Sequence, residues 1–156
     1  MIKKELTKSE TKEKALRLLA FRAHSEKELA EKLKMAGAKA EDISSVMEFV
    51  REYGFVNDAE YSVHLAKDLQ NLKKYGKRRI VSELKKRGIS AENINMALLE
   101  LSEGEEDTLF PLIEKKLGKN FEKKNIDKTI RYFIYRGYDF DDIKACIEKI
   151  RRDAEE

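Results

Sequence analysis

The sequence predicts an all-α protein, built as an elongated array of three tandem three-helix repeats with about nine helices and no sheet. Three observations lead to this prediction. Gly37, Gly88 and Gly137 recur at spacings of 51 and then 49 residues, as expected of an internal repeat. An apolar stripe with helical periodicity follows each glycine in the same register. No segment combines sustained alternation with enrichment in β-branched residues, which would indicate strands.

The stripes predict the last helix of each repeat. Apolar residues stand six, nine, ten and thirteen positions after each glycine, which is the i, i+3, i+4, i+7 pattern of one buried helix face. The twelve positions are Ile43, Val46, Met47 and Val50, then Ile94, Ala97, Leu98 and Leu101, then Ile143, Cys146, Ile147 and Ile150.

A capped middle helix is predicted to end at each glycine. Its buried side includes the apolar residue four positions before the glycine, and a residue type suited to an N-cap stands twelve positions before it. Glycine supplies the left-handed conformation that ends a helix. The apolar residues are Leu33, Leu84 and Phe133, and the expected N-caps are Ser25, Gly76 and Asn125.

The first helix of each repeat is less regular and is expected over residues 8–23, 58–72 and 107–117. Asn57 followed by Glu60, like Ser25 followed by Glu28, has the form of a capping box. Pro111 is tolerable in the third of these helices only within the first turn. The repeats are expected over residues 8–52, 57–102 and 107–152, which together form one elongated domain. An acidic run around residues 100–107 predicts a flexible joint.

Composition limits the classes of function. Lys and Arg number 33 and Asp and Glu 30, so the net charge is only +3 and charge matters only where it clusters. Cys146 is the only cysteine, which suits a reducing cytoplasm. No window is apolar enough to predict a signal peptide or a membrane span. The chain is therefore predicted to be cytoplasmic.

No catalytic residue, metal ligand or cofactor site is predicted. His24 and His64 have no partner at a metal-binding spacing and are expected at the surface or at helix edges. Cys146 falls in a buried stripe and is expected to be a packed thiol. The glycines match no phosphate-binding loop. We therefore expect no enzyme and no cofactor.

A basic segment of the second repeat, residues 72–88, is the candidate site for a partner or a phosphate. A solvated helix face explains such a run equally well, but the cations in the first turn oppose the helix dipole. The expected N-cap, Gly76, has no side-chain acceptor, so the helix amides are expected to be free for an external anion. Tyr75 is expected to pack. The candidate residues are Lys73, Lys74, Lys77, Arg78, Arg79, Lys85 and Lys86, with Arg78, Arg79, Lys85 and Lys86 forming an exposed stripe.

Three segments together resemble the RecX family: ALRLLAFRAHSEKELAEKL (15–33), YGFVNDAEY (53–61) and YGKRRIVSELKKRGI (75–89). The resemblance is strong over residues 13–101 and weak over the third repeat. Asn57 stands where the family usually has an acidic residue, and Tyr61 where phenylalanine is common. Both departures are chemically mild.

This resemblance implies a cytosolic protein that binds the RecA recombinase filament on single-stranded DNA and restrains its ATPase, strand-exchange and coprotease activities. We expect the protein itself to be a monomer. The resemblance offers no catalytic residue. Phe55, Asn57 and Asp58 match the family's turn motif, and we expect them to shape the junction between repeats more than to touch the partner. The alternatives are a helical repeat protein that binds DNA or RNA directly through phosphates, and an adaptor with another partner.

Overall fold

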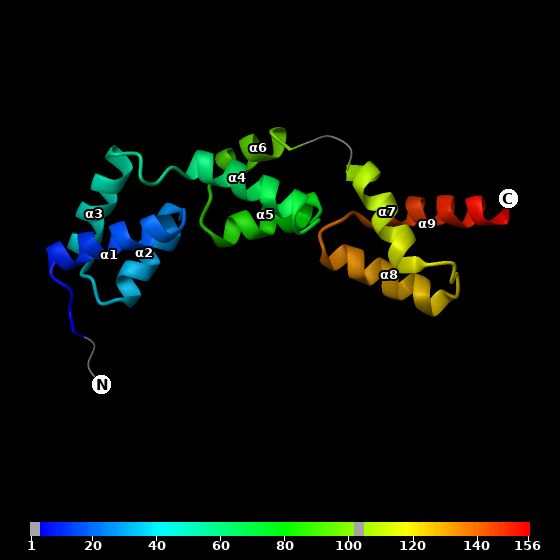
Figure 1. Ribbon diagram of the computed structural model, residues 1–156, viewed down its shortest axis with the longest axis horizontal. Coiled ribbons are helices and arrows are strands. Elements are labelled where there is room, and N and C mark those ends of the chain that lie inside the picture. Colours follow the sequence, from blue (N-terminus) through cyan, green and yellow to red (C-terminus); the bar gives the residue numbers. More distant parts are fainter. Residues whose placement is uncertain (1–3, 102–104) are drawn as a thin grey trace. The chain divides into compact units, whose positions relative to one another are not determined.

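A computed structural model describes residues 4–101 and 105–156, and the described residues form nine α-helices and no strand (Figure 1). The all-α prediction is therefore confirmed. The predicted joint falls largely on residues 102–104 and on side chains 105–107, which lie outside the described part. The helices are α1 (Lys8–Phe21), α2 (Glu26–Met35), α3 (Ala40–Glu52), α4 (Asp58–Asn71), α5 (Lys77–Lys86), α6 (Ala91–Leu99), α7 (Glu105–Leu117), α8 (Lys123–Tyr135) and α9 (Phe140–Glu155).

The chain contacts divide the protein into two compact units. The first unit comprises residues 1–65 and 84–97, and the second comprises residues 66–83 and 98–156. Both units include part of α4 and part of α5, so the division does not follow the predicted repeats. The repeat boundaries and the elongated shape stay predictions.

Each unit has its own apolar core, to which the predicted stripes contribute together with residues of the other helices. The first core is Ala15, Leu29, Leu33, Val46, Met47, Val50 and Val56. The second is Leu109, Ile113, Leu117, Phe133, Tyr138, Ile143, Cys146, Ile147 and Ile150. Of the twelve stripe positions only Ile43 and Leu98 are partly exposed, so the helical register read from the sequence is correct in all three repeats.

Most predicted helix ends are also correct. Ser25 and Glu28 form a complete capping box at the start of α2, and Gly37, Gly88 and Gly137 all have positive φ. Asn125 is not an N-cap, however, because α8 begins two residues earlier with Glu122 in the capping position. The Asn125 side-chain amide instead donates to the carbonyls of Leu117, the last residue of α7, and of Asn120 in the following loop.

The expectation that Pro111 lies in the first turn of its helix is wrong. The helix α7 starts at Glu105 and runs through the proline. A proline inside a helix removes one backbone hydrogen bond and is costly. Leu109, Ile113 and Leu117 on the same helix are at most 2% exposed. Burial of this face stabilises α7 despite the proline, so tertiary packing overrides local preference.

Candidate partner-binding surface

The basic residues predicted as a site lie on α5 and on the segment before it. Lys77, Arg78, Lys85 and Lys86 are exposed on α5. Lys73 and Lys74 are exposed in the preceding segment. Six of the seven candidate cations thus lie at the surface, and the seventh, Arg79, does not.

Arg79 belongs to a contact between the second and third repeats inside the second unit. Its guanidinium pairs with Glu83 at 3.0 Å and donates to the Tyr135 carbonyl at 3.3 Å. The rings of Tyr75 and Tyr135 lie 4.8 and 4.9 Å from its central carbon, and its side chain is only 21% exposed. The prediction that Arg79 forms an exposed stripe with Arg78, Lys85 and Lys86 is therefore wrong.

The prediction that the amides at the start of α5 are free for an anion is also wrong. The Arg78 amide donates to the Gly137 carbonyl at 3.2 Å, and the Gly76 amide donates to the Arg136 carbonyl at 2.9 Å. The amides of Arg79 and Ile80 both donate to the Gly76 carbonyl. A Cβ on Gly76 would overlap the Gly137 carbonyl, so glycine stands at this cap because two backbones approach closely.

The first unit contains an equivalent contact. The hydroxyl of Ser25, the N-cap of α2, donates to the Arg87 carbonyl at 2.6 Å. A Cβ on Gly88 would lie 2.5 Å from the side chain of Lys27. In each unit, the start of the middle helix of one repeat therefore packs against the glycine turn of the next repeat.

The turn-motif residues connect the first two repeats within the first unit. Asp58 accepts a 2.9 Å hydrogen bond from the Glu26 amide in the first turn of α2, and burial raises the pKa of Asp58. Asn57 accepts from the Glu60 amide at 3.1 Å and so caps α4. Phe55 is half exposed and its ring stacks on Tyr53 at 5.9 Å. Whether any of the three touches a partner stays a prediction.

Glu28 is the centre of a hydrogen-bond network in the same unit. Its carboxylate accepts from the Tyr61 hydroxyl at 2.6 Å, from the Ser25 amide at 3.1 Å and from the Arg22 guanidinium at 3.1 Å. Burial raises the pKa of Glu28, but these donors outweigh burial and hold the pKa at about 2. Burial and the bond to Glu28 raise the pKa of Tyr61 to about 12.

His24 directly precedes the N-cap of α2, at a helix edge as expected, but it is buried and does not lie at the surface. It is 2% exposed, with Nδ1 2.9 Å from the Arg22 carbonyl and Nε2 2.8 Å from Nζ of Lys32. These partners suit a neutral ring that donates from Nδ1 and accepts at Nε2. Burial lowers the pKa of His24. The lack of a metal-ligand partner near His24 in the sequence therefore does not indicate that its side chain is exposed.

No cluster of three or more His, Cys, Asp or Glu side chains in residues 4–101 and 105–156 could hold a metal ion. No helix of the same residues is long and apolar enough to cross a bilayer.

Comparison with known proteins identifies relatives over most of the chain. The family description "RecX, first three-helix domain" matches residues 12–49, and "RecX, second three-helix domain" matches residues 57–98. The Regulatory protein RecX of Clostridium beijerinckii is 35% identical over 145 residues, which cover 89% of this chain and 67% of that protein. The protein of the same name from Vibrio cholerae is 33% identical over 144 residues, covering 91% of this chain and 94% of that one.

A solved structure shares the fold. The crystal structure of RecX from Lactobacillus salivarius superposes with a TM-score of 0.78 at 20% identity, covering 91% of this chain and 95% of that chain. The likeness supports the all-α architecture.

Proposed function

Because the chain belongs to the RecX family of regulatory proteins, we propose that it is a non-enzymatic regulator that binds the RecA recombinase filament on single-stranded DNA. In this proposal it restrains the ATPase, strand-exchange and coprotease activities of the recombinase. The observation that carries the proposal is family membership across both matched three-helix domains. The relatives are named as regulatory proteins, which supports a role without catalysis.

The exposed cations of α5 are the surface that we propose meets the filament. Lys77 and Arg78 lie in the first turn of the helix, where positive charge opposes the helix dipole at a cost of about 0.3–1 kcal/mol each. That turn contains no acidic residue. Lys85 and Lys86 extend the positive charge along the same helix. A positive surface favours a partner surface of negative potential, and it increases the rate and specificity of association.

The test is a titration of this protein into the ATPase assay of the matching recombinase on single-stranded DNA. We expect inhibition at well below one protein per recombinase monomer. Reversal of three exposed cations (Lys77→Glu, Lys85→Glu and Lys86→Glu together) is expected to raise the half-inhibitory concentration by about tenfold or more, a change of about 1.4 kcal/mol. Arg79 is left intact because it supports the fold.

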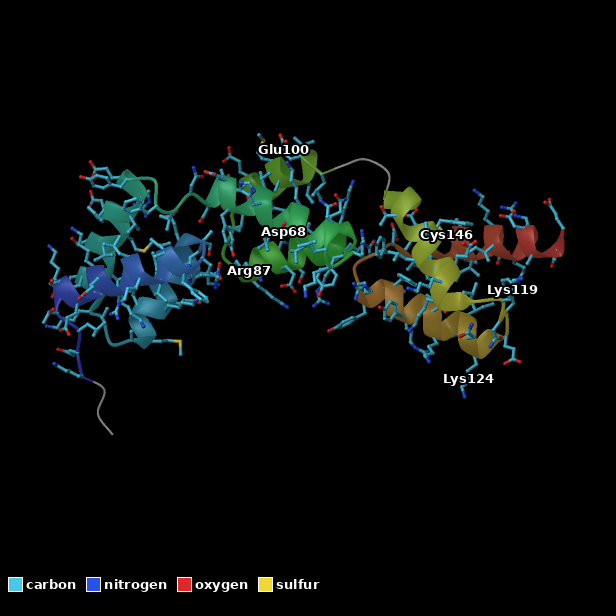
Figure 2. The ribbon with its side chains drawn as sticks, in the orientation of Figure 1. Asp68, Arg87, Glu100, Lys119, Lys124 and Cys146 are labelled. Carbon is cyan, nitrogen blue, oxygen red and sulfur yellow. The ribbon has the colours of Figure 1, made fainter. Side chains whose placement is uncertain are left out.

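The matched control reverses three exposed lysines of the third repeat, Lys123, Lys124 and Lys144. Lys124, for example, points outward from α8 (Figure 2). The net charge change is the same, so a general loss of positive charge would affect both variants alike. Equal inhibition by the α5 variant and the parent would show that the cations of α5 are only a solvated face. Absence of inhibition by the parent would refute the regulatory proposal itself.

A further inference from the structure

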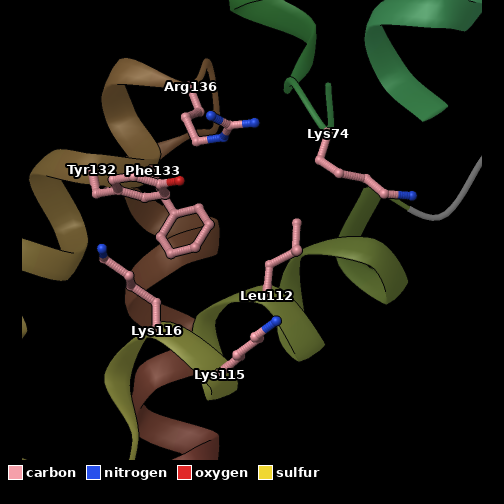
Figure 3. A pocket seen from close by; sticks show the side chains of 7 residues that line it. All are labelled: Lys74, Leu112, Lys115, Lys116, Tyr132, Phe133 and Arg136. Atoms are coloured by element: carbon pink, nitrogen blue, oxygen red, sulfur yellow. The ribbon is translucent and has the colours of Figure 1, made fainter. Parts of the chain in front are cut away.

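A pocket of about 390 Å³ lies in the second unit (Figure 3). Three segments line it: α7, α8 and the short segment before α5. Its size is at the lower end of the range for small-molecule sites. The lining residues are Lys74, Leu112, Lys115, Lys116, Tyr132, Phe133 and Arg136.

The pocket is strongly positive. Four of its seven lining residues are cations and none is a carboxylate. No ion pair joins Lys74, Lys115 or Lys116 to an acidic group of the described residues. The protein has almost as many acidic as basic side chains, so this cluster of cations creates a local positive potential that attracts an anion.

The pocket also offers an aromatic ring and an apolar base. Phe133 is 2% exposed and forms part of the core, whereas Tyr132 is 41% exposed. Nζ of Lys116 lies 4.4 Å from the centre of the Tyr132 ring, and the guanidinium carbon of Arg136 lies 5.5 Å from it. An accessible ring flanked by cations suits a ligand that has both a flat π-system and a negative charge.

The rim of the pocket is held in place by the contact between the second and third repeats. Lys74 has φ of 57°, and among the described residues it is the only non-glycine residue with positive φ. The Tyr138 hydroxyl donates to the Lys74 carbonyl at 2.8 Å, and Arg136 donates to the Lys73 carbonyl. Strained backbone that is held by tertiary bonds is concentrated at ligand sites.

We propose that this pocket binds a nucleotide of a single-stranded nucleic acid, with the base against Tyr132 and the phosphates at Lys74, Lys115, Lys116 and Arg136. The proposal goes beyond regulation of the recombinase, because the binding requires no second protein. A single strand fits better than a duplex because its base faces are free to stack. An acidic peptide would satisfy the cations but would offer no flat ring to the part of Tyr132 that Lys116 and Arg136 leave exposed.

The test measures the anisotropy of a labelled oligothymidine over a range of salt concentrations, with no recombinase present. Lys115→Gln with Lys116→Gln is expected to weaken binding and to flatten the dependence of log K on log salt, by about 0.7 for each phosphate that the variant no longer neutralises. Tyr132→Leu is expected to weaken binding by roughly 5- to 150-fold, the contribution of one stacked base, without changing the salt slope.

The control for charge is Lys123→Gln with Lys124→Gln, which removes two exposed lysines from the same repeat and should leave affinity close to that of the parent. Helicity and melting of each variant establish that it is folded. An oligonucleotide carrying 5-iodouracil should crosslink at Tyr132 on irradiation. A free nucleoside monophosphate should compete more strongly than inorganic phosphate, and the oligonucleotide more strongly than either.

Three results would overturn the proposal. One is an affinity that Tyr132→Leu leaves unchanged, since the site would then recognise charge alone. Another is crosslinking confined to Tyr75 or Tyr135, which would move the contact to the region of Arg79. The third is a protein that binds a polyglutamate peptide but does not bind the oligonucleotide, which would assign the pocket to an acidic protein partner. None of them bears on inhibition of the recombinase, so the two proposals fail separately.

Discussion

The hydroxyl of Tyr61 on α4 donates a 2.6 Å hydrogen bond to the carboxylate of Glu28 on α2. The bond joins the first two repeats. Tyr61→Phe keeps the ring and removes the donor, and we expect it to lower the free energy of unfolding by about 1.5–3 kcal/mol, as for hydrogen bonds to charged groups. Urea denaturation checks this. An unchanged midpoint would mean that Glu28 finds an equivalent donor in solvent.

The low pKa of Glu28 predicts acid sensitivity between about pH 4.5 and 2. The folded-state pKa of about 2 lies below the ordinary value of 4.5, so the unfolded chain binds this proton first. The stabilisation is complete above pH 4.5 and is lost as pH falls towards 2, by up to about 3 kcal/mol. Glu28→Gln should reduce the slope of stability against pH in this window, as measured by urea titrations. An unaltered slope would contradict the network.

His24 predicts a second, milder window. Burial lowers its pKa below the ordinary value of 6.5, so the neutral ring stabilises the fold fully above pH 6.5 and the benefit falls as pH drops below that value. Protonation would also place a second positive charge beside Lys32. His24→Gln should remove the loss of melting temperature between pH 7 and 5, whereas His64→Gln at an exposed position should retain it. Equal behaviour of the two variants would refute this role for His24.

Substitutions at four glycines distinguish the cost of backbone strain from the cost of close approach between chain segments. Gly54 has φ of 71° and open space around its Cβ position, whereas a Cβ on Gly76 would overlap the Gly137 carbonyl without positive φ. Gly54→Ala should therefore lose about 1–2 kcal/mol from strain alone, and Gly76→Ala about 1–3 kcal/mol from overlap alone. Gly137→Ala combines positive φ with overlap on Arg79 and should lose the most.

Gly88→Ala should lose less than Gly137→Ala, because the atoms nearest its Cβ would belong to the Lys27 side chain, whereas a Cβ on Gly137 would also meet the backbone nitrogen of Arg79. Gly88→Val adds a β-branch at positive φ and should cost at least as much as Gly88→Ala. Thermal melting of the set gives the order directly. If Gly76→Ala melted like the parent, the backbone contact with Gly137 would not exist in solution.

The features predicted correctly from sequence depend on neighbours along the chain. Helical periodicity identified the buried positions of α3 and α9, and local spacing identified the Ser25–Glu28 capping box. Residues whose role depends on a distant partner were misread or missed. The sequence around Gly76 predicts an open anion site, because no neighbouring residue indicates that the Gly137 turn covers it.

Neither the pocket nor the position of Pro111 in its helix follows from local sequence. Lys74, Lys116 and Tyr132 belong to three separate segments, so no single stretch of sequence indicates that they line one pocket. For Pro111, the low helix propensity of proline predicts a position in the first helical turn. Burial of Leu109 and Ile113 outweighs that propensity, and the helix continues through the proline.

Arg79 separates the structural cations of α5 from those available to a partner. Arg79→Ala removes the pair with Glu83, the bond to the Tyr135 carbonyl and the packing between two tyrosine rings. We expect a loss of about 1–2 kcal/mol in stability, because the ion pair is largely shielded and the guanidinium is hydrogen-bonded. Arg78→Ala removes only a 3.5 Å pair between exposed groups and should change stability by less than about 0.5 kcal/mol.

Arg78→Ala should impair inhibition of the recombinase more than Arg79→Ala does, which is the opposite of their order in loss of stability. Arg78→Ala, which alters an exposed cation, is expected to weaken inhibition of the recombinase ATPase while melting like the parent. Arg79→Ala should lower the melting temperature, and at temperatures where it remains folded it should inhibit nearly as well as the parent. If Arg79→Ala instead abolished inhibition without loss of stability, the guanidinium would contact the partner directly and its bond to Tyr135 would be incidental.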